Sequence, residues 1–220
     1  MKNRIIAIDG PSGTGKSTTA RLLGERMNIP YIDSGKMYRG ITYVLLKNNV
    51  KPNNIKRITE ITSSSEFEFA NDNVYLNGKD ITKRIKTLEV LNKVSSVSKI
   101  KELREILVRK LRGFGEDGNL IMDGKDIGTV VFPGADYKFF IICDLDTKAA
   151  RRQQEFLDMG LKISKDKIIK ELKKRDEMDT TRKISPLKKA KDAIEIDTTH
   201  MIIEEQVDLL YRNIFSNTNC

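Results

Sequence analysis

Histidine, cysteine and tryptophan are scarce in this chain of 220 residues, which has one histidine, two cysteines and no tryptophan. With His200 as the single histidine, sites built on histidine pairs and zinc sites built on several Cys and His residues are excluded. Cys143 lies in an apolar stretch and Cys220 is the last residue, so a disulfide framework has no support. Any bound metal is therefore expected to be a hard cation held by oxygen atoms.

Long apolar runs are also lacking. No stretch approaches the roughly 18 apolar residues that a membrane-spanning helix needs. The apolar run "IIAI" near the N-terminus is too short for the core of a secretory signal peptide. We therefore expect a cytoplasmic protein without membrane attachment, and its length fits one domain that carries an insertion.

Positive charge is concentrated in one segment. Residues 148–191 contain 15 lysines and arginines against 7 acids, which accounts for +8 of the total net charge of +9. Such a segment fits either a nucleic-acid surface or a site for polyphosphate ligands. The segment has a single aromatic residue, Phe156, so platforms for stacking nucleic-acid bases are scarce. We expect no nucleic-acid partner, and salt-sensitive RNA binding would favour the other interpretation.

The stretch "GPSGTGKST" fits the phosphate-binding pattern G-x-x-x-x-G-K-[ST], with an apolar run before it and a helical pattern after it. Its glycines let successive backbone N–H groups point at one anion, and the following helix adds its positive end. We expect Lys16 to bridge the outer phosphates of ATP and Ser17 to ligate Mg²⁺. The expected ATP contacts are Gly10, Pro11, Ser12, Gly13, Thr14, Gly15, Lys16, Ser17 and Thr18.

Strand and helix patterns alternate along most of the chain. Short buried strands are expected at 4–9, 29–33, 119–124, 137–144 and 193–197. Helices are expected after residue 15 and at 37–48, 147–160, 164–179 and 201–215, with two more between 88 and 114 that break near 95–98. Residues 67–82 alternate with period two around "ND" and "NG", which predicts a small antiparallel sheet. The fold class is therefore α/β: a P-loop NTPase-type parallel sheet with helices on both faces, plus an antiparallel insertion.

Polar residues follow two further strands, at the sheet edge where ligands bind in open α/β folds. In "DSGKMYR", Ser34 and Arg39 have the chemistry to receive a monophosphate, although a polar helix start explains the same pattern. In "LIMDGKDIGT", Asp123 lies at a strand end and suits a water-mediated Mg²⁺ contact, and a turn aspartate is the alternative.

The stretch "RDEMDTTR" places Arg175, Asp179 and Arg182 on one face if its helix continues. These side chains either close over phosphates as a lid or form a solvated ion-pair face. Arg151 and Arg152 have the same two interpretations.

Taken together, "GPSGTGKST", "DSGKMYR", "DGKDIGTVVFPGADYKFF" and "KKRDEMDTTR" in this order resemble bacterial-type cytidylate kinases, nucleoside monophosphate kinases that phosphorylate CMP and dCMP. The resemblance covers essentially the whole chain. It implies a core at 1–34, 118–147 and 192–220, a monophosphate-binding insertion at about 35–117, a lid at about 148–191, and a monomer that uses ATP with Mg²⁺.

The resemblance also assigns residues. Around the transferring phosphate it gathers Lys16, Arg151, Arg175 and Arg182. On CMP it places Ser34, Arg39 and Arg182 at the phosphate, Asp179 at the sugar, Ser95, Arg104 and Asp126 at the base, and Lys125 beside them. Lys125 stands where the family usually has arginine, and it lacks the two-pronged geometry of a guanidinium.

The base assignment has a chemical reason, because cytosine offers an amino donor at N4 and acceptors at N3 and O2. The Asp126 carboxylate, the Arg104 guanidinium and the Ser95 hydroxyl complement those groups. Uracil would turn a carbonyl oxygen toward Asp126, which predicts a preference for CMP over UMP of roughly tenfold or more.

Two other P-loop functions remain to be distinguished. A GTPase requires Asn-Lys-x-Asp, and the nearest match, "NKVS", ends in Ser95 within a helical pattern. A kinase for a small non-nucleotide alcohol would keep the P-loop without needing base-reading residues, so substrate profiling separates it from a nucleotide kinase.

Overall fold

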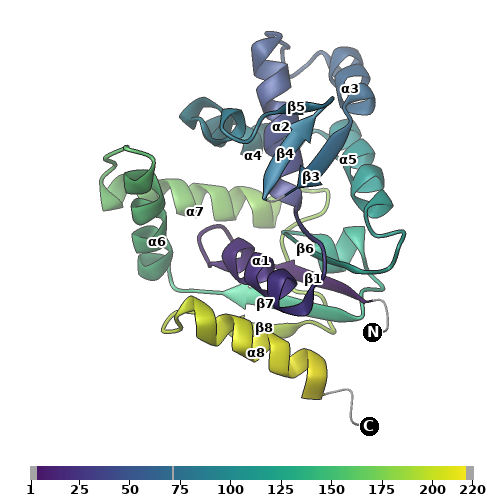
Figure 1. Ribbon diagram of the computed structural model, residues 1–220. Coiled ribbons are helices and arrows are strands. Elements are labelled where there is room, and N and C mark those ends of the chain that lie inside the picture. Colours follow the sequence, from purple (N-terminus) through teal and green to yellow (C-terminus); the bar gives the residue numbers. More distant parts are fainter. Residues whose placement is uncertain (1–3, 71, 217–220) are drawn as a thin grey trace. The chain divides into compact units, whose positions relative to one another are not determined.

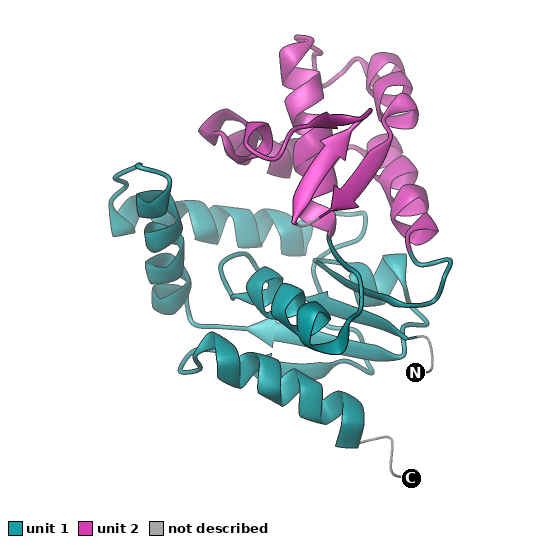
Figure 2. Ribbon diagram, viewed as in Figure 1, with its two compact units in different colours: residues 1–32, 115–220 teal, residues 33–114 magenta. Residues whose placement is uncertain are grey.

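A computed structural model describes residues 4–70 and 72–216, which divide into two units (Figure 2). Unit 1 comprises residues 1–32 and 115–220, and unit 2 comprises residues 33–114. Cys220 lies outside the described residues, whereas Cys143 is a half-buried free thiol. Within the described part of the chain, no helix has the length and apolar character needed to cross a membrane.

Unit 1 is built on a five-stranded sheet with the strand order β2-β6-β1-β7-β8 (Figure 1). Its strands are β1 (Ile5–Asp9), β2 (Tyr31–Asp33), β6 (Leu120–Gly124), β7 (Tyr137–Ile142) and β8 (Ile194–Asp197). The pairs β1–β6, β1–β7 and β7–β8 are parallel, which confirms the expected parallel sheet. Because the chain leaves β1 toward β2 on one side and later forms β7 on the other, the carboxyl end of β1 is a topological switch point, where such folds bind ligands.

Helices α1 (Lys16–Met27) and α8 (Ile203–Ser216) pack against each other and share the core with one face of this sheet. The alternation of a strand sends Ile6 and Ile8 of β1 into that core, whereas Asp9 points to the opposite face. A short π-helix, η2 (Ile127–Val131), packs against β1 and β6. Helices α6 (Leu145–Asp158) and α7 (Lys165–Thr181) pack against each other.

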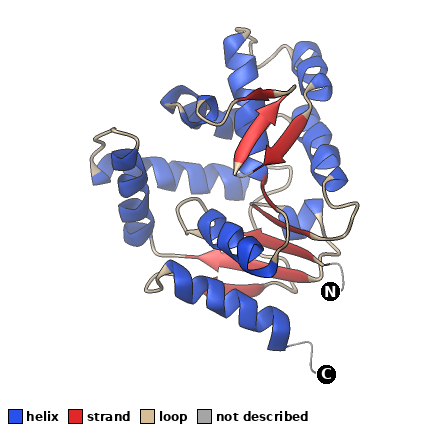
Figure 3. Ribbon diagram, viewed as in Figure 1, coloured by secondary structure: helices blue, strands red, loops and turns tan. Residues whose placement is uncertain are grey.

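Unit 2 combines a small sheet with helices (Figure 3). Its strands β3 (Phe67–Ala70), β4 (Asn73–Leu76) and β5 (Lys79–Asp80) are antiparallel, which confirms the sheet expected at 67–82. Its helices are α2 (Ser34–Lys47), α3 (Ile55–Ser64), α4 (Leu88–Val97) and α5 (Lys101–Gly113), with a 3₁₀ turn, η1, at Arg84–Lys86. The break between α4 and α5 confirms the interruption expected near residues 95–98.

Several local features differ from the sequence expectations or were absent from them, and one is that α2 begins at Ser34 and not at residue 37. Helix α3 and the π-helix η2 were not anticipated. Helix α7 ends at Thr181, and Arg182 already has extended backbone angles. Arg175 and Asp179 therefore lie on the helix, whereas Arg182 lies just beyond its end and not on the same helical face. The division into core, insertion and lid stays a prediction.

Candidate active site

The P-loop turns sharply between β1 and α1 because glycines occupy its demanding positions. Gly10 has φ +153°, and a Cβ there would lie 2.2 Å from the carbonyl oxygen of Ile141. Gly15 adopts a left-handed conformation as the residue before α1. Helix α1 has no side-chain cap and no acidic residue in its first turn, so its N-terminal N–H groups suit an anion.

Hydrogen bonds within unit 1 hold carbonyl oxygens of the P-loop in place. Lys16 Nζ donates to the carbonyl oxygen of Pro11 over 3.0 Å, so the lysine folds over its own loop. Arg151 donates to the carbonyl oxygens of Thr14, at 3.0 Å, and Thr198, at 2.7 Å. The buried Thr198 hydroxyl also donates to Thr14, at 3.0 Å. Arg151 therefore joins the loop to the segment that follows β8.

Three oxygen-bearing side chains meet where the P-loop runs into α1. The Ser17 hydroxyl donates to Asp123 Oδ2 over 2.8 Å, and the Tyr31 hydroxyl donates to Asp123 Oδ1 over 2.7 Å. Asp123 sits in β6 directly beside Ile8 of β1, which explains why it reaches the start of α1. A hydroxyl and a carboxylate are oxygen ligands that suit Mg²⁺, so these residues fit the expected cation.

A buried cluster of opposite charges lies in the same unit. Arg182, which is 8% exposed, contacts Asp179 at 3.5 Å and Asp126 at 3.7 Å, while its Nε donates to the carbonyl oxygen of Ser185 at 2.6 Å. Lys125 forms an ion pair with Asp179. The structure thus brings together four of the residues that the sequence predicts for the site: Lys125, Asp126, Asp179 and Arg182.

The ionisation of Lys125 is shifted strongly in this cluster. Burial, reinforced by the positive charge of Arg175, lowers the pKa of Lys125 from 10.5 to about 7, although Asp179 acts in the opposite direction. The influence of Arg175 also shows that this arginine belongs electrostatically to the cluster. An arriving phosphate would favour the charged lysine, since an anion stabilises the ammonium form.

Asp9, the last residue of β1, is a functional candidate that the sequence argument missed. Its Oδ1 accepts the N–H of Ile127 at 2.8 Å and its Oδ2 accepts the N–H of Gly128 at 2.7 Å. Burial raises the pKa of Asp9 to about 7, while the two backbone N–H bonds oppose this rise. An acid directly before the first glycine of the P-loop, at the end of an apolar strand, is the signal that could have identified it.

In unit 2, the candidate phosphate residues lie at the start of α2. Asp33 caps this helix by accepting the N–H of Lys36, and Ser34 is buried in the first turn. Arg39, one turn further along, donates to Asp33 Oδ2 over 2.7 Å. A Cβ on Gly35 would lie 2.9 Å from both Arg39 and Asp33, so glycine leaves room for this pair. The cap and the ion pair tie Arg39 to Asp33, the residue that directly precedes Ser34.

The candidate base residues of unit 2 gather where α4 gives way to α5. Arg104 is 2% exposed, donates to the carbonyl oxygen of Ser98 over 3.0 Å and lies 5.0 Å from the centre of the Tyr38 ring. The Ser98 hydroxyl donates to the carbonyl oxygen of Ser95 over 3.1 Å. Unit 2 therefore brings Ser95 and Arg104 to the same helix junction.

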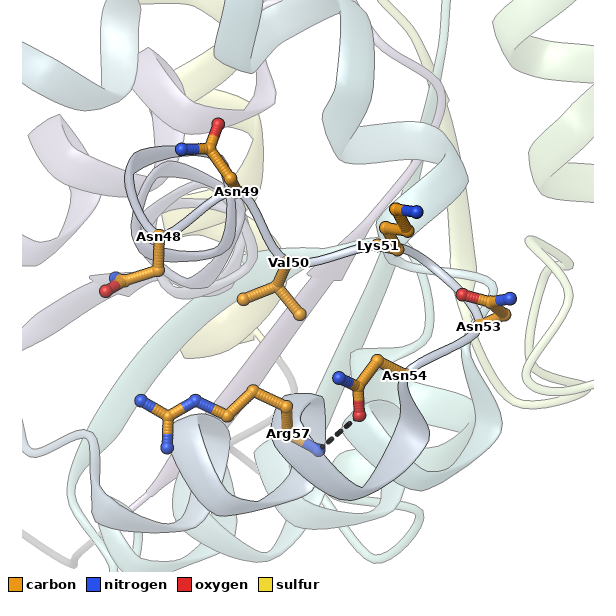
Figure 4. A pocket seen from close by; sticks show the side chains of 7 residues that line it. All are labelled: Asn48, Asn49, Val50, Lys51, Asn53, Asn54 and Arg57. Carbon is orange, nitrogen blue, oxygen red and sulfur yellow. Dashed lines mark hydrogen bonds between the residues drawn. The ribbon is translucent and has the colours of Figure 1, made fainter.

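A pocket of about 400 Å³ in unit 2 does not coincide with these residues (Figure 4). Its lining joins the end of α2 to the start of α3 and consists of Asn48, Asn49, Val50, Lys51, Asn53, Asn54 and Arg57. Asn54 caps α3 by accepting the N–H of Arg57 at 3.1 Å, which Figure 4 marks with a dashed line. The side chains that line the pocket are polar apart from Val50, and none is among the candidate site residues.

Sequence comparisons give a consistent result. The family model described as "Cytidylate kinase" matches residues 6–216. The cytidylate kinase of Clostridioides difficile (strain 630) is 44% identical over 208 residues, covering 94% of this chain and 96% of that protein. The cytidylate kinase of Fusobacterium nucleatum subsp. nucleatum is 44% identical over 214 residues, covering 97% of this chain and 98% of that protein.

Comparisons of the fold lead to more distant proteins. An uncharacterized protein from Eubacterium ventriosum superposes with a TM-score of 0.54 at 15% identity, covering 98% of this chain and 99% of the other. Shikimate kinase from Acinetobacter baumannii superposes with a TM-score of 0.50 at 14% identity, covering 100% and 97%. At these identities the likeness shows a shared fold and nothing about substrates.

Proposed function

Because this chain belongs to the cytidylate kinase family, we propose that it transfers the γ-phosphoryl group of ATP to CMP, and also to dCMP, giving ADP and CDP or dCDP. The reaction is a step of pyrimidine nucleotide metabolism. The structural observation that carries the proposal is the buried Asp126–Arg182–Asp179 cluster, which lies in the same unit as the P-loop. A P-loop kinase for a simple alcohol has no evident use for two buried carboxylates held by one arginine.

On the donor side, we assign the triphosphate of ATP to the backbone N–H groups of the P-loop and to Lys16. The open N-terminus of α1 supports this assignment, because it stabilises negative charge. Lys16 then neutralises charge that spreads over the transferring phosphoryl group. Arg151 supports the loop through the carbonyl oxygen of Thr14, and Arg175 adds positive charge close to Lys125.

On the acceptor side, we assign the CMP phosphate to Ser34, Arg39 and Arg182, with Lys125 adding charge, and the sugar hydroxyls to Asp179. We assign the cytosine base to Ser95, Arg104 and Asp126. The acceptor phosphate is already ionised at neutral pH, so no histidine base is required, and positioning and charge provide most of the rate acceleration. The basic segment at 148–191 acts as a lid that keeps water from hydrolysing ATP.

Mg²⁺ accompanies ATP in this proposal, with Ser17 as a ligand and Asp123 as a contact through water. When bound, the ion neutralises phosphate charge.

Asp123→Asn is expected to raise the Mg²⁺ concentration that gives half-maximal activity by about tenfold, because a neutral amide holds a hydrated cation less well than a carboxylate. A Mg²⁺ titration at saturating ATP and CMP measures this shift. Asp117→Asn is the matched control, because Asp117 is an exposed acid of unit 1 outside the candidate site. If the Asp123→Asn variant and the wild-type enzyme reach half-maximal activity at the same Mg²⁺ concentration, Asp123 does not belong to the cation site.

The substrate assignment is tested with a coupled ADP-release assay that uses ATP·Mg²⁺ and each of CMP, dCMP, UMP, AMP and GMP. We expect the highest turnover with CMP or dCMP, and kcat/KM for CMP at least about tenfold above that for UMP. Equal values for CMP and UMP would remove Asp126 from the base-reading role. Absence of turnover with all five nucleotides would contradict the proposed function itself.

We further propose that the enzyme acts as a monomer in the cytoplasm, with nucleotides as its partners. The scarcity of cysteine and the absence of a long apolar run in the sequence support this placement. The molar mass in solution, measured by light scattering against the chain mass of 25.1 kDa, tests the monomer.

A further inference from the structure

The carboxylate of Asp9 is buried between the P-loop and the segment that carries Asp126. Asp9 is 4% exposed, and Gly10, the first residue of the P-loop, follows it directly. Both of its oxygens are used within unit 1, one on the N–H of Ile127 and one on the N–H of Gly128. These two residues are the first two of the π-helix η2. Asp9 thus caps η2 from a neighbouring strand.

The capping contacts hold the backbone immediately after Asp126. Asp126 itself has φ −149° and ψ 26°, outside the helical range, and precedes η2. Its carbonyl oxygen accepts the N–H groups of Val130 at 2.9 Å and Val131 at 3.1 Å. The peptide unit that follows Asp126 is therefore held at both of its polar atoms: Asp9 accepts the N–H of Ile127, and two N–H groups of η2 bind the Asp126 carbonyl oxygen. The direction of the Asp126 side chain depends on this local backbone.

The charge of Asp9 also interacts with one residue assigned to each substrate, Asp126 for CMP and Lys16 for ATP. The negative charge of Asp126 raises the pKa of Asp9, and the positive charge of Lys16 lowers it. A buried carboxylate of this kind costs stability in its ionised form. Such a group is typical of positions where function, rather than stability, determines the residue.

We propose that Asp9 is a positioning residue for acceptor selection, whose carboxylate fixes the backbone of Ile127 and Gly128 and thereby aims Asp126 at the base of CMP. The inference rests on the proposed function, in which Asp126 reads the amino group of cytosine. Asp9 touches neither nucleotide in this proposal and acts through Asp126 alone.

The variant Asp9→Asn distinguishes a role in orienting Asp126 from a contribution to overall stability alone. Its single carbonyl oxygen accepts one of the two N–H groups, while its NH₂ group faces the other donor and pushes it away. We expect KM for CMP to rise about tenfold and the CMP-to-UMP ratio of kcat/KM to fall from at least about tenfold toward about one. KM for ATP should change less than about twofold, because the hydrogen bonds of the side chain run to η2 and the charge of Lys16 is the smallest of the influences on the pKa of Asp9.

Asp136→Asn is the matched control. Asp136 Oδ2 accepts the N–H of Ile5 over 2.8 Å, so it makes the same kind of contact at the opposite end of β1. We expect wild-type selectivity and wild-type KM values for this variant. A second variant, Gly128→Ala, crowds the Asp9 contact from the other partner, because its Cβ would lie in a tight contact of 3.2 Å with Cδ of Lys138 while touching Asp9 Oδ2 at 3.4 Å, so that room for the new methyl group has to be made beside this carboxylate. It should lower the CMP-to-UMP ratio in the same direction by a smaller factor.

The kinetic outcomes distinguish the two proposals. A wild-type enzyme that does not phosphorylate CMP overturns the proposed function and this inference with it. A wild-type enzyme that prefers CMP, combined with Asp9→Asn and Gly128→Ala variants whose CMP-to-UMP ratios stay within about twofold of wild type, overturns the role of Asp9 alone. Loss of kcat or of thermal stability at unchanged selectivity counts as that second result. If Asp9→Asn does not fold, the ratio measured for Gly128→Ala decides.

Discussion

Lys16→Ala is expected to lower kcat for CMP phosphorylation by about 10² to 10³ fold, the loss typical of removing one preorganised charge contact to a transition state. The lysine follows Gly15 at the start of α1, where backbone N–H groups and the helix dipole already favour phosphate. Its ammonium group donates to the carbonyl oxygen of Pro11. This contact keeps the group beside the loop, from where it can exchange a carbonyl partner for phosphate oxygens.

The measurement is steady-state turnover at saturating ATP·Mg²⁺ and CMP, together with a thermal unfolding curve. Lys191→Ala is the matched control, since Lys191 is an exposed lysine at the end of the basic segment and is assigned to neither nucleotide. We expect the control to retain wild-type turnover and both variants to unfold near the wild-type temperature. A Lys16→Ala enzyme that keeps more than about a tenth of wild-type turnover would contradict the role of Lys16.

The parts of the fold that the sequence predicted well are those fixed by local pattern. The run "IIAID" predicts β1 because its apolar residues are buried within a parallel sheet, and the glycines that follow it predict the P-loop because the backbone there requires them. The alternating residues at 67–82 predict the antiparallel strands for a similar reason. In each case the information lies within a few neighbouring residues.

The features that the sequence argument missed depend on contacts between distant residues. Asp9 contacts Ile127 and Gly128, far along the chain, and no local pattern shows that an acid at the end of β1 caps a helix there. The π-helix itself contains two consecutive valines, whose branching disfavours helix in isolation. Arg151 was expected near the transferring phosphate, and its contact with the carbonyl oxygen of Thr14 adds a role in bracing the P-loop that only the fold reveals.

Arg182 shows how the sequence can identify the right residue by an incomplete geometric argument. Helical spacing suggested a common face with Asp179, yet α7 ends at Thr181. The extended backbone at Arg182 turns its side chain back, so that it contacts Asp179 and also reaches Asp126. The end of the helix, rather than its continuation, therefore places one guanidinium between two buried carboxylates.

Arg182→Ala is accordingly expected to lower kcat/KM for CMP by about 10² fold or more, since truncating one partner of a buried charge pair typically costs several kcal/mol. It should also reduce the free energy of unfolding by about 3 kcal/mol, because Asp126 and Asp179 lose a shared counter-charge in a site that is almost closed to water. Lys125 still pairs with Asp179 in this variant. Asp126 is then the carboxylate that loses its counter-charge, and it should account for most of the decrease in the free energy of unfolding. Kinetics with CMP and urea unfolding measure the two effects.

Arg182→Lys separates charge from geometry. An ammonium group keeps the positive charge between the carboxylates but cannot contact both as a planar fork. We therefore expect most of the stability to return while kcat/KM for CMP stays about tenfold below wild type. Arg152→Ala is the matched control, since Arg152 lies in the same basic segment and pairs with the exposed Glu155, and it should leave both quantities near wild type. If Arg182→Ala behaved like this control, Arg182 would have neither a catalytic role nor a structural one, and the phosphate of CMP would have to depend on Arg39 and Lys125.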